Sequence, residues 1–421
     1  MSIQLRTSPR SWLSRQLGLP LTWSEVSGGL GDLGTLLPIL LSLSLAGQVS
    51  LSSSLIFGGF WNVFTGIYWG IPVCVQPMKA LAATALTKGL SSEEVSGAGL
   101  LVGGVLVILG VSGLVTLVAR WSPKSVVQGL QLGTGLVLAS KAAKLLSPLG
   151  WLPFRASFHW ADNAWWALAA GVFIAFSTSG TRSTSRIPSA LILFSLGCFF
   201  IVIRLLTDEE VSEPRWPYPH PQGSIPAPKA PSIEDATYGF LTAGLGQLPL
   251  TLLNSVVALV ALSSTLFPPS MEERLSSSPS SYSPKQLSIR EVTCMVGIMN
   301  LIGPWFQAMP TCHGSGGLAA QYRFGARRGG SVMVLGAGKI LLGVLFGPTL
   351  LPALTRFPSS FLGVMLFTSG MELAMAAIPK ETDINGHLEW TVRLATAGSL
   401  IAFSHDGIGY LVGLASPPVS P

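Results

Sequence analysis

Long apolar stretches separated by short polar ones recur along the whole chain. The first half holds seven of them, at residues 30–45, 55–69, 75–86, 97–119, 126–146, 164–176 and 187–206. The second half holds five, at 240–267, 292–306, 312–322, 331–354 and 361–378, and a tail at 388–414 that fits one span or two. About 20 apolar residues in a helix cross a hydrocarbon core of roughly 30 Å. The pattern predicts an all-α polytopic membrane protein with about 12 to 14 spans.

The composition supports this prediction. Hydrophobic residues make up 49% of the chain and charged residues only 10%, with a mean hydropathy of +0.55, whereas a soluble domain carries about a quarter charged residues. The net charge of +6 comes from basic residues that stand singly in loops, so no nucleic-acid-binding patch is expected. The four cysteines have no metal-ligand spacing, and we expect no metal and no other cofactor.

Loop charges predict the orientation. Basic residues follow even-numbered spans, as expected for loops on the cytoplasmic side: Arg120, Lys124, Arg182, Arg186, Arg323, Arg327 and Arg328. Residues 207–236 carry six acidic and two basic residues. We therefore expect a cytoplasmic tail at 1–27, although an organellar transit signal is the alternative, and an extracytoplasmic linker at 207–236. Lys141 and Lys144, near the end of the fifth span, do not fit this rule.

The two halves resemble each other. Gly-Leu-Gly-Asp-Leu at 29–33 is echoed by Gly-Leu-Gly-Gln-Leu at 244–248. Asn62 precedes a Pro-Val-Cys element at 72–74 by ten residues, and Asn300 precedes Pro-Thr-Cys at 310–312 by the same spacing. Short matches arise easily by chance, but two in the same order favour a true repeat. Seven spans in each copy, at 28–206 and 237–416, would invert the second copy in the membrane, an arrangement in which broken helices form a site at the midplane.

The first broken segment lies around Gln76, Met78 and Lys79. Pro77 suits the first turn of a helix, and a helix starting there would direct free N–H groups and the positive end of its dipole at the centre of the protein. Such a start binds anions. Gln76 would add a hydrogen-bond donor and Lys79 a charge. The alternative for Lys79 is snorkelling, or a structural pair with Asp32.

The second broken segment contains Cys312, His313, Ser315, Gly316 and Gly317. A turn rich in glycine and serine that opens a helix lets backbone amides approach an anion, as in phosphate loops. The alternatives are that the glycines only let helices pack closely and that His313 is a buried neutral ring. The substrate-binding candidates are Gln76, Met78, Lys79, Cys312, His313, Ser315, Gly316 and Gly317. We predict no catalytic residues, since the adjacent Cys312 and His313 are only a nominal nucleophile and base.

Acidic residues inside a span are costly unless they are paired or functional. Asp32, at the start of the first span, and Glu372, in the apolar run 361–378, are therefore candidates for coupling transport to an ion. Gln247 occupies the position of Asp32 in the second repeat and is the neutral counterpart. Residues 29–34 also fit a dinucleotide fingerprint, but no β-strand precedes them, so a nucleotide site is rejected.

Three of these motifs resemble a known family. Val75-Gln76-Pro77-Met78-Lys79-Ala80, and residues 309–319 (MPTCHGSGGLA) continued by QYRFGAR, resemble the two signatures of the eukaryotic molybdate transporter family, and residues 31–35 resemble its first-span motif. The family is a distant branch of the sulfate permease superfamily. The resemblance implies an inverted seven-plus-seven fold with core and gate domains, high-affinity molybdate uptake and no carboxy-terminal regulatory domain.

The function expected from these features is secondary active import of molybdate, a tetrahedral dianion. At an inside-negative potential of about 100 mV, importing two negative charges costs roughly 4.6 kcal/mol, which two co-moving protons would cancel. The alternatives are transport of sulfate or another oxyanion by the same fold, and an anion channel. Expected partners are the oxyanion and the lipid bilayer, with a homodimer as a further option. The plasma membrane is the first expectation for the location, and a mitochondrial or vacuolar membrane the second.

Overall fold

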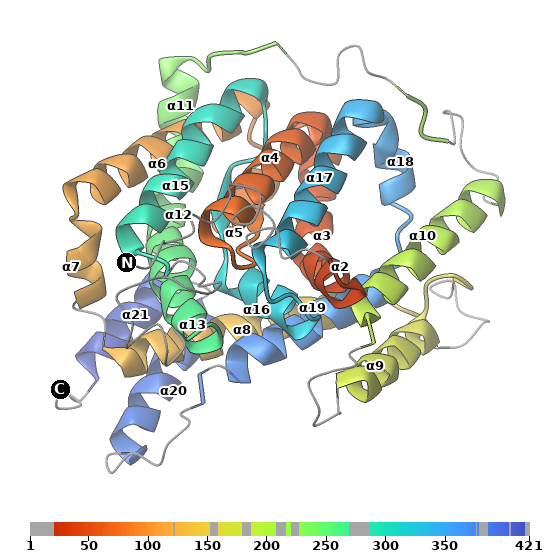
Figure 1. Cartoon of the computed structure of the whole chain (residues 1–421). Helices are drawn as coiled ribbons and strands as arrows, with labels where there is room; N and C mark the ends of the chain where they lie inside the picture. Colours follow the sequence, from red (N-terminus) through yellow and green to blue (C-terminus); the bar gives the residue numbers. More distant parts are fainter. Residues whose placement is uncertain are drawn as a thin grey trace, which may run out of the picture.

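Helices make up nearly all of the structure, a computed structural model that describes residues 21–120, 123–151, 159–178, 187–207, 216–219, 227–268, 286–375, 377–378, 386–403 and 406–416 (Figure 1). The elements of the first half are α2 (Trp23–Leu30), α3 (Leu33–Leu45), α4 (Leu51–Trp69), β1 (Val75–Pro77), α5 (Lys79–Lys88), α6 (Ser92–Ser112), α7 (Val115–Arg120), α8 (Lys124–Leu146), α9 (Ala164–Thr178) and α10 (Ser189–Thr207).

The second half also consists of helices with one short strand. It contains α11 (Ile233–Gly239), the π-helical turn η1 (Phe240–Gly244), α12 (Leu245–Leu250), the π-helical turn η2 (Thr251–Ala258), α13 (Leu259–Leu266), α15 (Ile289–Ile302), η3 (Gly303–Phe306), β2 (Thr311–His313), α16 (Ser315–Arg323), α17 (Gly329–Leu345), η4 (Gly347–Leu350), α18 (Leu351–Leu354), α19 (Ser359–Met375), α20 (Gly386–Phe403) and α21 (Asp406–Ala415). The tail that fitted one span or two thus forms two helices.

Few helices are long and apolar enough to cross a bilayer alone. Within the described residues these are α6, α10 and the continuous run Ile233–Leu266, and five spans qualify if two bent pairs each count as one. The bent pairs are α2 with α3, at 41°, and α17 with residues 347–354, at 112°. The short helix α16 is almost entirely buried, so protein rather than lipid surrounds it.

Two predicted spans end earlier than expected. The expected span 97–119 is divided, because α6 ends at Ser112 and Gly113 follows with φ +78°, a conformation that favours glycine and stops a helix. The expected span 331–354 ends at Leu345, where the chain turns sharply into η4 and α18. The eighth span begins at Ile233, four residues before the expected start of the second repeat at 237.

The helices form two groups. In the core group, α4 packs on α17 and α6 packs on α15; in the gate group, α8 packs on both α19 and α20 (Figure 1). Small residues allow these close crossings: a Cβ on Gly59 would lie 2.5 Å from the Gly336 carbonyl oxygen, and one on Gly135 would lie 2.6 Å from that of Gly370. The pairings join the second span to the eleventh and the fourth to the ninth, as two inverted repeats require.

The two repeats meet at a short antiparallel ladder between β1 and β2. Its register places Val75 opposite His313 and Gln76 opposite Cys312. Val75 follows Cys74, and His313 follows Cys312, so Val75 pairs with its own counterpart in the other repeat. This is the local twofold relation that an inverted repeat produces.

Candidate functional site

A spacing shared by the two repeats explains how the extended segments are held. Oδ1 of Asn62 accepts a hydrogen bond of 2.7 Å from the Val75 amide. Oδ1 of Asn300 accepts one of 2.9 Å from the Thr311 amide, and its Nδ2 donates to the Thr311 carbonyl at 2.6 Å. Both asparagines are fully buried. Buried backbone groups need such partners, so the paired asparagines position the ladder.

The ladder brings the starts of α5 and α16 together, since each helix begins within two residues of its strand. A Cβ placed on Gly316 would lie 4.0 Å from Nζ of Lys79. The two broken segments, 235 residues apart in sequence at Pro77 and Cys312, therefore form one buried centre.

The start of α16 is the more open of the two. Among the described residues, the structure gives no hydrogen-bond partner to the backbone amides of Ser315 and Gly316. The Ser315 hydroxyl donates to Oδ1 of Asn254, in η2, at 2.5 Å. Gly316 faces Lys79 of α5, Leu138 of α8 and Leu373 of α19. This helix start thus points at the contact between the core and gate groups.

Gly317 is needed for close packing rather than for access. A Cβ at this position would lie 2.2 Å from Sγ of Cys74 and 2.4 Å from Nε2 of Gln76, closer than any side chain tolerates. The alternative considered for these glycines, that they let segments pack closely, therefore describes Gly317, whereas Gly316 lies where the segment approaches Lys79.

The start of α5 is capped by the other repeat. Oε1 of Gln247, in α12, accepts hydrogen bonds from the amides of Ala80 at 2.9 Å and Leu81 at 3.0 Å, and its Nε2 donates to the Thr251 hydroxyl at 2.9 Å. These amides are among those a helix start leaves unpaired. The positive group left at this start is Nζ of Lys79, which is buried and has no hydrogen-bond partner among the described residues.

Asp32 lies in the break between α2 and α3 and is buried. The Gln76 side chain donates a hydrogen bond to its carboxylate, and Lys79 and Lys339 are the cations that act on it. Sequence reasoning missed Lys339, which is buried inside α17. The sequence did contain a signal for Lys339, because a lysine inside an apolar span is costly unless it is paired or functional.

His313 lies at the inner end of β2. Its Nδ1 is 3.0 Å from the Cys74 carbonyl oxygen, so Nδ1 carries the proton. Its ring meets that of Trp69 edge to face at 5.2 Å, and Nε2 is buried without a hydrogen-bond partner in the described part of the chain. Cys312 and Met78 are also buried, and Sγ of Cys312 lies 3.8 Å from the Pro77 carbonyl oxygen.

Glu372 is not part of this centre. Its Oε2 lies 3.4 Å from Nη1 of Arg323, which is the last residue of α16. The nine residues of α16, at about 1.5 Å each, separate this ion pair from Ser315. The pair joins α16 of the core group to α19 of the gate group.

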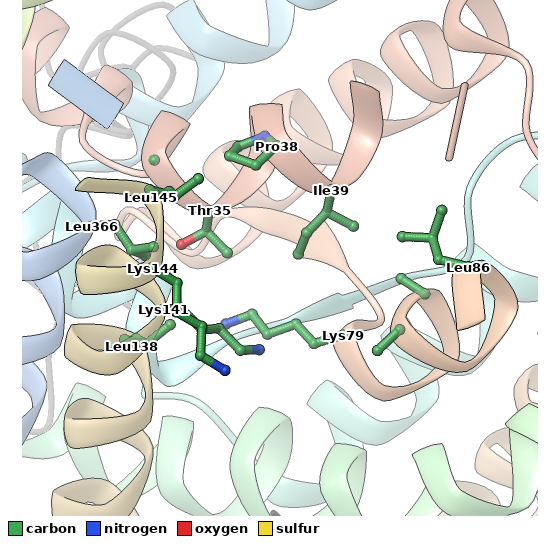
Figure 2. A pocket seen from close by; sticks show the side chains of 13 residues that line it. Thr35, Pro38, Ile39, Lys79, Leu86, Leu138, Lys141, Lys144, Leu145 and Leu366 are labelled. Atoms are coloured by element: carbon green, nitrogen blue, oxygen red, sulfur yellow. The ribbon is translucent and has the colours of Figure 1, made fainter. Parts of the chain in front are cut away.

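A cavity of about 300 Å³ lies next to the centre, between α3, α5, α8 and α19 (Figure 2). Lys79 lines it, together with Lys141 and Lys144 of α8. The remaining lining is mostly apolar: Gly34, Thr35, Pro38, Ile39, Ala82, Ala83, Leu86, Leu138, Leu145 and Leu366.

Both halves of the chain match one known protein family. Residues 24–138 and 239–373 match the family model described as "Molybdate transporter of MFS superfamily". The chain belongs to the molybdate transporter family. Molybdate transporter 2 of Arabidopsis thaliana is 37% identical over 445 residues, which cover 96% of this chain and 88% of that protein. Molybdate transporter 1 of Chlamydomonas reinhardtii is 33% identical, over 95% of this chain and 92% of that protein.

Solved structures agree on the fold. The transmembrane domain of the cyanobacterial bicarbonate transporter BicA superimposes with a TM-score of 0.53 at 14% identity, covering 93% of this chain and 97% of that one. Murine Slc26a9, an anion transporter in the inward-facing state, gives 0.58 at 14% identity, covering 99% and 72%. The predicted seven-plus-seven fold is confirmed. The chain is an integral membrane transport protein of this family, not an enzyme.

Proposed function

We propose that the protein is a secondary active carrier that imports molybdate, and that the dianion binds in front of α16 beside Lys79. One observation carries the proposal: the Lys79 ammonium group is buried without a hydrogen-bond partner among the described residues, and the start of α16 lies next to it. A buried ammonium group without hydrogen bonds is costly, and the oxygens of a bound anion would supply them.

The chemistry of the surrounding groups suits a tetrahedral oxyanion. The amides of Ser315 and Gly316 and the positive end of the α16 dipole would bind two oxygens, and Lys79 would neutralise one charge. Gln76 would contribute through its position between Asp32 and Gly317. Met78, Cys312 and His313 would form the wall. The geometry favours an anion site made of the start of α16 and Lys79 over a site made of two equivalent helix starts. The amides at the start of α5 already donate to Gln247.

Coupling to protons would use Asp32. Its carboxylate is joined to Gln76 and lies under the influence of Lys79, so a proton on Asp32 would change the field at the anion. Two inward-moving negative charges cost roughly 4.6 kcal/mol at about 100 mV, and proton symport would offset this. Gln247, also a coupling candidate, is better explained as a cap that positions α5.

Alternating access would move the core group against the gate group. The ion pair of Arg323 with Glu372 spans these groups, so we assign Glu372 to holding them together on the cytoplasmic side rather than to coupling. We retain the topology with a cytoplasmic tail at 1–27 and an extracytoplasmic linker at 207–236. The plasma membrane is our proposed location, and a homodimer our proposed assembly.

Calorimetric titration of the purified protein with molybdate tests the proposal. Ser315→Ala removes the hydroxyl that ties the start of α16 to Asn254, so the amides of Ser315 and Gly316 should be held less firmly and molybdate binding should weaken. Gln76→Ala should also weaken binding. Ser264→Ala removes a hydroxyl that, in the part of the chain the structure describes, bonds only within α13, and it is the matched control. Absence of molybdate binding by the unsubstituted protein would refute the site.

Two further measurements separate the alternatives. Excess sulfate that competes fully with labelled molybdate during uptake into liposomes would indicate a general oxyanion carrier of the same fold. Single-channel currents in planar bilayers would indicate a channel.

A further inference from the structure

The lysine-lined cavity next to the proposed site has no role in the function proposed so far. Its lining residues include three lysines and no acidic side chain. In Figure 2 the side chains of Lys79, Lys141 and Lys144 reach toward the same part of the cavity from α5 and α8. Positively charged side chains that line one cavity give it a positive potential, which attracts an anion. The lining therefore points to an anionic occupant.

The position of the cavity shows which side of the membrane its lysines face. Lys141 and Lys144 lie in the last two turns of α8, which ends at Leu146. The chain that follows α8 contains Asp162, whose carboxylate accepts hydrogen bonds from the first amides of α19, at Ser359 and Ser360. Residues just before α19 contact the end of α10, where Arg204 donates to the Arg356 carbonyl. The linker 207–236 begins there, so the two lysines lie toward the linker side of the protein.

This location explains two lysines that the positive-inside rule does not. Loops on the linker side should be poor in basic residues, yet Lys141 and Lys144 are exposed there. Snorkelling to the interface is the simplest alternative for such residues. It does not account for both of them lining one cavity together with a third lysine from another helix.

The cavity adjoins the proposed site. Lys79 and Leu138 both line it, and the same two side chains face Gly316, with Cδ1 of Leu138 2.9 Å from a Cβ placed there. A volume of about 300 Å³ accommodates a small ion with several waters, at about 30 Å³ per water.

We propose that this cavity is the extracytoplasmic vestibule for the oxyanion, with Lys141 and Lys144 as a first docking site and Lys79 as the group that passes the anion on to α16. This inference rests on the proposed function. Fixed cations in a cavity with apolar walls raise the local concentration of an anion and the rate at which it arrives, and salt weakens the effect. The two lysines should therefore govern capture more than final affinity.

Initial rates of molybdate uptake into liposomes of neutral lipid test this. At about 10 mM salt the double variant K141Q/K144Q should lower kcat/KM by about tenfold or more, with kcat little changed, and the difference should shrink above about 0.3 M salt. K141R/K144R should restore the rate. Lys88→Gln removes one charge from the linker side, at the end of α5 and outside the cavity lining, and should have little effect. A double variant equal to the unsubstituted protein at low salt would overturn the proposal.

Two controls show whether a negative result refutes the proposed function or only the vestibule. If the unsubstituted protein binds no molybdate at equilibrium, the proposed function fails; if it binds and transports normally while the lysine variants do too, only the vestibule fails. If the effect of the lysines appears only when anionic lipid is added to the liposomes, the cavity holds a lipid headgroup and the proposal is overturned.

Accessibility gives a second, independent test. Lys144→Cys should react with a membrane-impermeant sulfonate-bearing thiol reagent added from the linker side, and saturating molybdate should slow that reaction by about fivefold or more. The native cysteines are buried or half-buried, so the unsubstituted protein serves as the background. Reaction only from the opposite side, or at a rate that molybdate does not change, would contradict the vestibule.

Discussion

Replacing Lys79 with glutamine tests the centre of the proposed site most directly. The substitution keeps a similar length but removes the charge. An anion touching the start of α16 would lie near 4 Å from Nζ, because the Cβ position on Gly316 is 4.0 Å away. At that distance and an effective dielectric constant of about 20, two unit charges interact by about 4 kcal/mol. Molybdate carries two charges, and Asp32 opposes part of the attraction.

The substitution removes one partner from a buried charge pair, and the expected loss of binding free energy is about 2–5 kcal/mol. At about 1.4 kcal/mol per tenfold, Lys79→Gln should weaken molybdate binding by at least about 30-fold. Lys79→Arg should retain most of the affinity. Equilibrium binding to purified protein measures both, and thermal unfolding without molybdate controls for misfolding. A folded Lys79→Gln protein that binds as tightly as the unsubstituted one would refute the assignment of Lys79.

Three further substitutions test other parts of the structure. Asp32→Asn should leave molybdate binding measurable but make liposome uptake insensitive to an imposed pH gradient; retained sensitivity would exclude Asp32 as the coupling residue. Gly317→Ala should destabilise the protein by several °C in thermal unfolding, since its Cβ would lie 2.2 Å from a buried sulfur, whereas Gly338→Ala, with open space around it, should not. Arg323→Glu should change the uptake rate severalfold by breaking its pair with Glu372, and adding Glu372→Arg should reverse this; a double variant no better than the single one would show that the pair does not control access.

The sequence alone determined the architecture, because membrane insertion leaves a strong local record. Apolar stretches set the spans, and the repeated spacing from Asn62 and Asn300 to a Pro-x-Cys element revealed two repeats and their broken segments. An odd number of spans per repeat then required inversion. The structure adds why the asparagines recur: each binds the backbone of its own extended segment. These contacts lie within one repeat and so are visible as a spacing.

The helix ends were harder to predict than the spans. The stretch 97–119 contains no charged residue, yet Gly113 stops α6. The stretch 331–354 contains a sharp turn that hydropathy does not record. Hydrophobicity reports the solvent around a segment, whereas a turn depends on a few backbone angles.

Only the tertiary structure decided which residues meet across the repeats. Gln247 was paired with Asp32 by sequence position, but it caps α5 of the other repeat. Glu372 is a coupling candidate by its place in an apolar run, and the fold adds its contact with Arg323. Lys141 and Lys144 do not fit the positive-inside rule, and the structure shows that they line one cavity with Lys79. Sequence spacing carries information along one helix or strand, whereas charges and hydrogen bonds act over a few ångströms in space, and only the packing of distant helices brings these groups within that range.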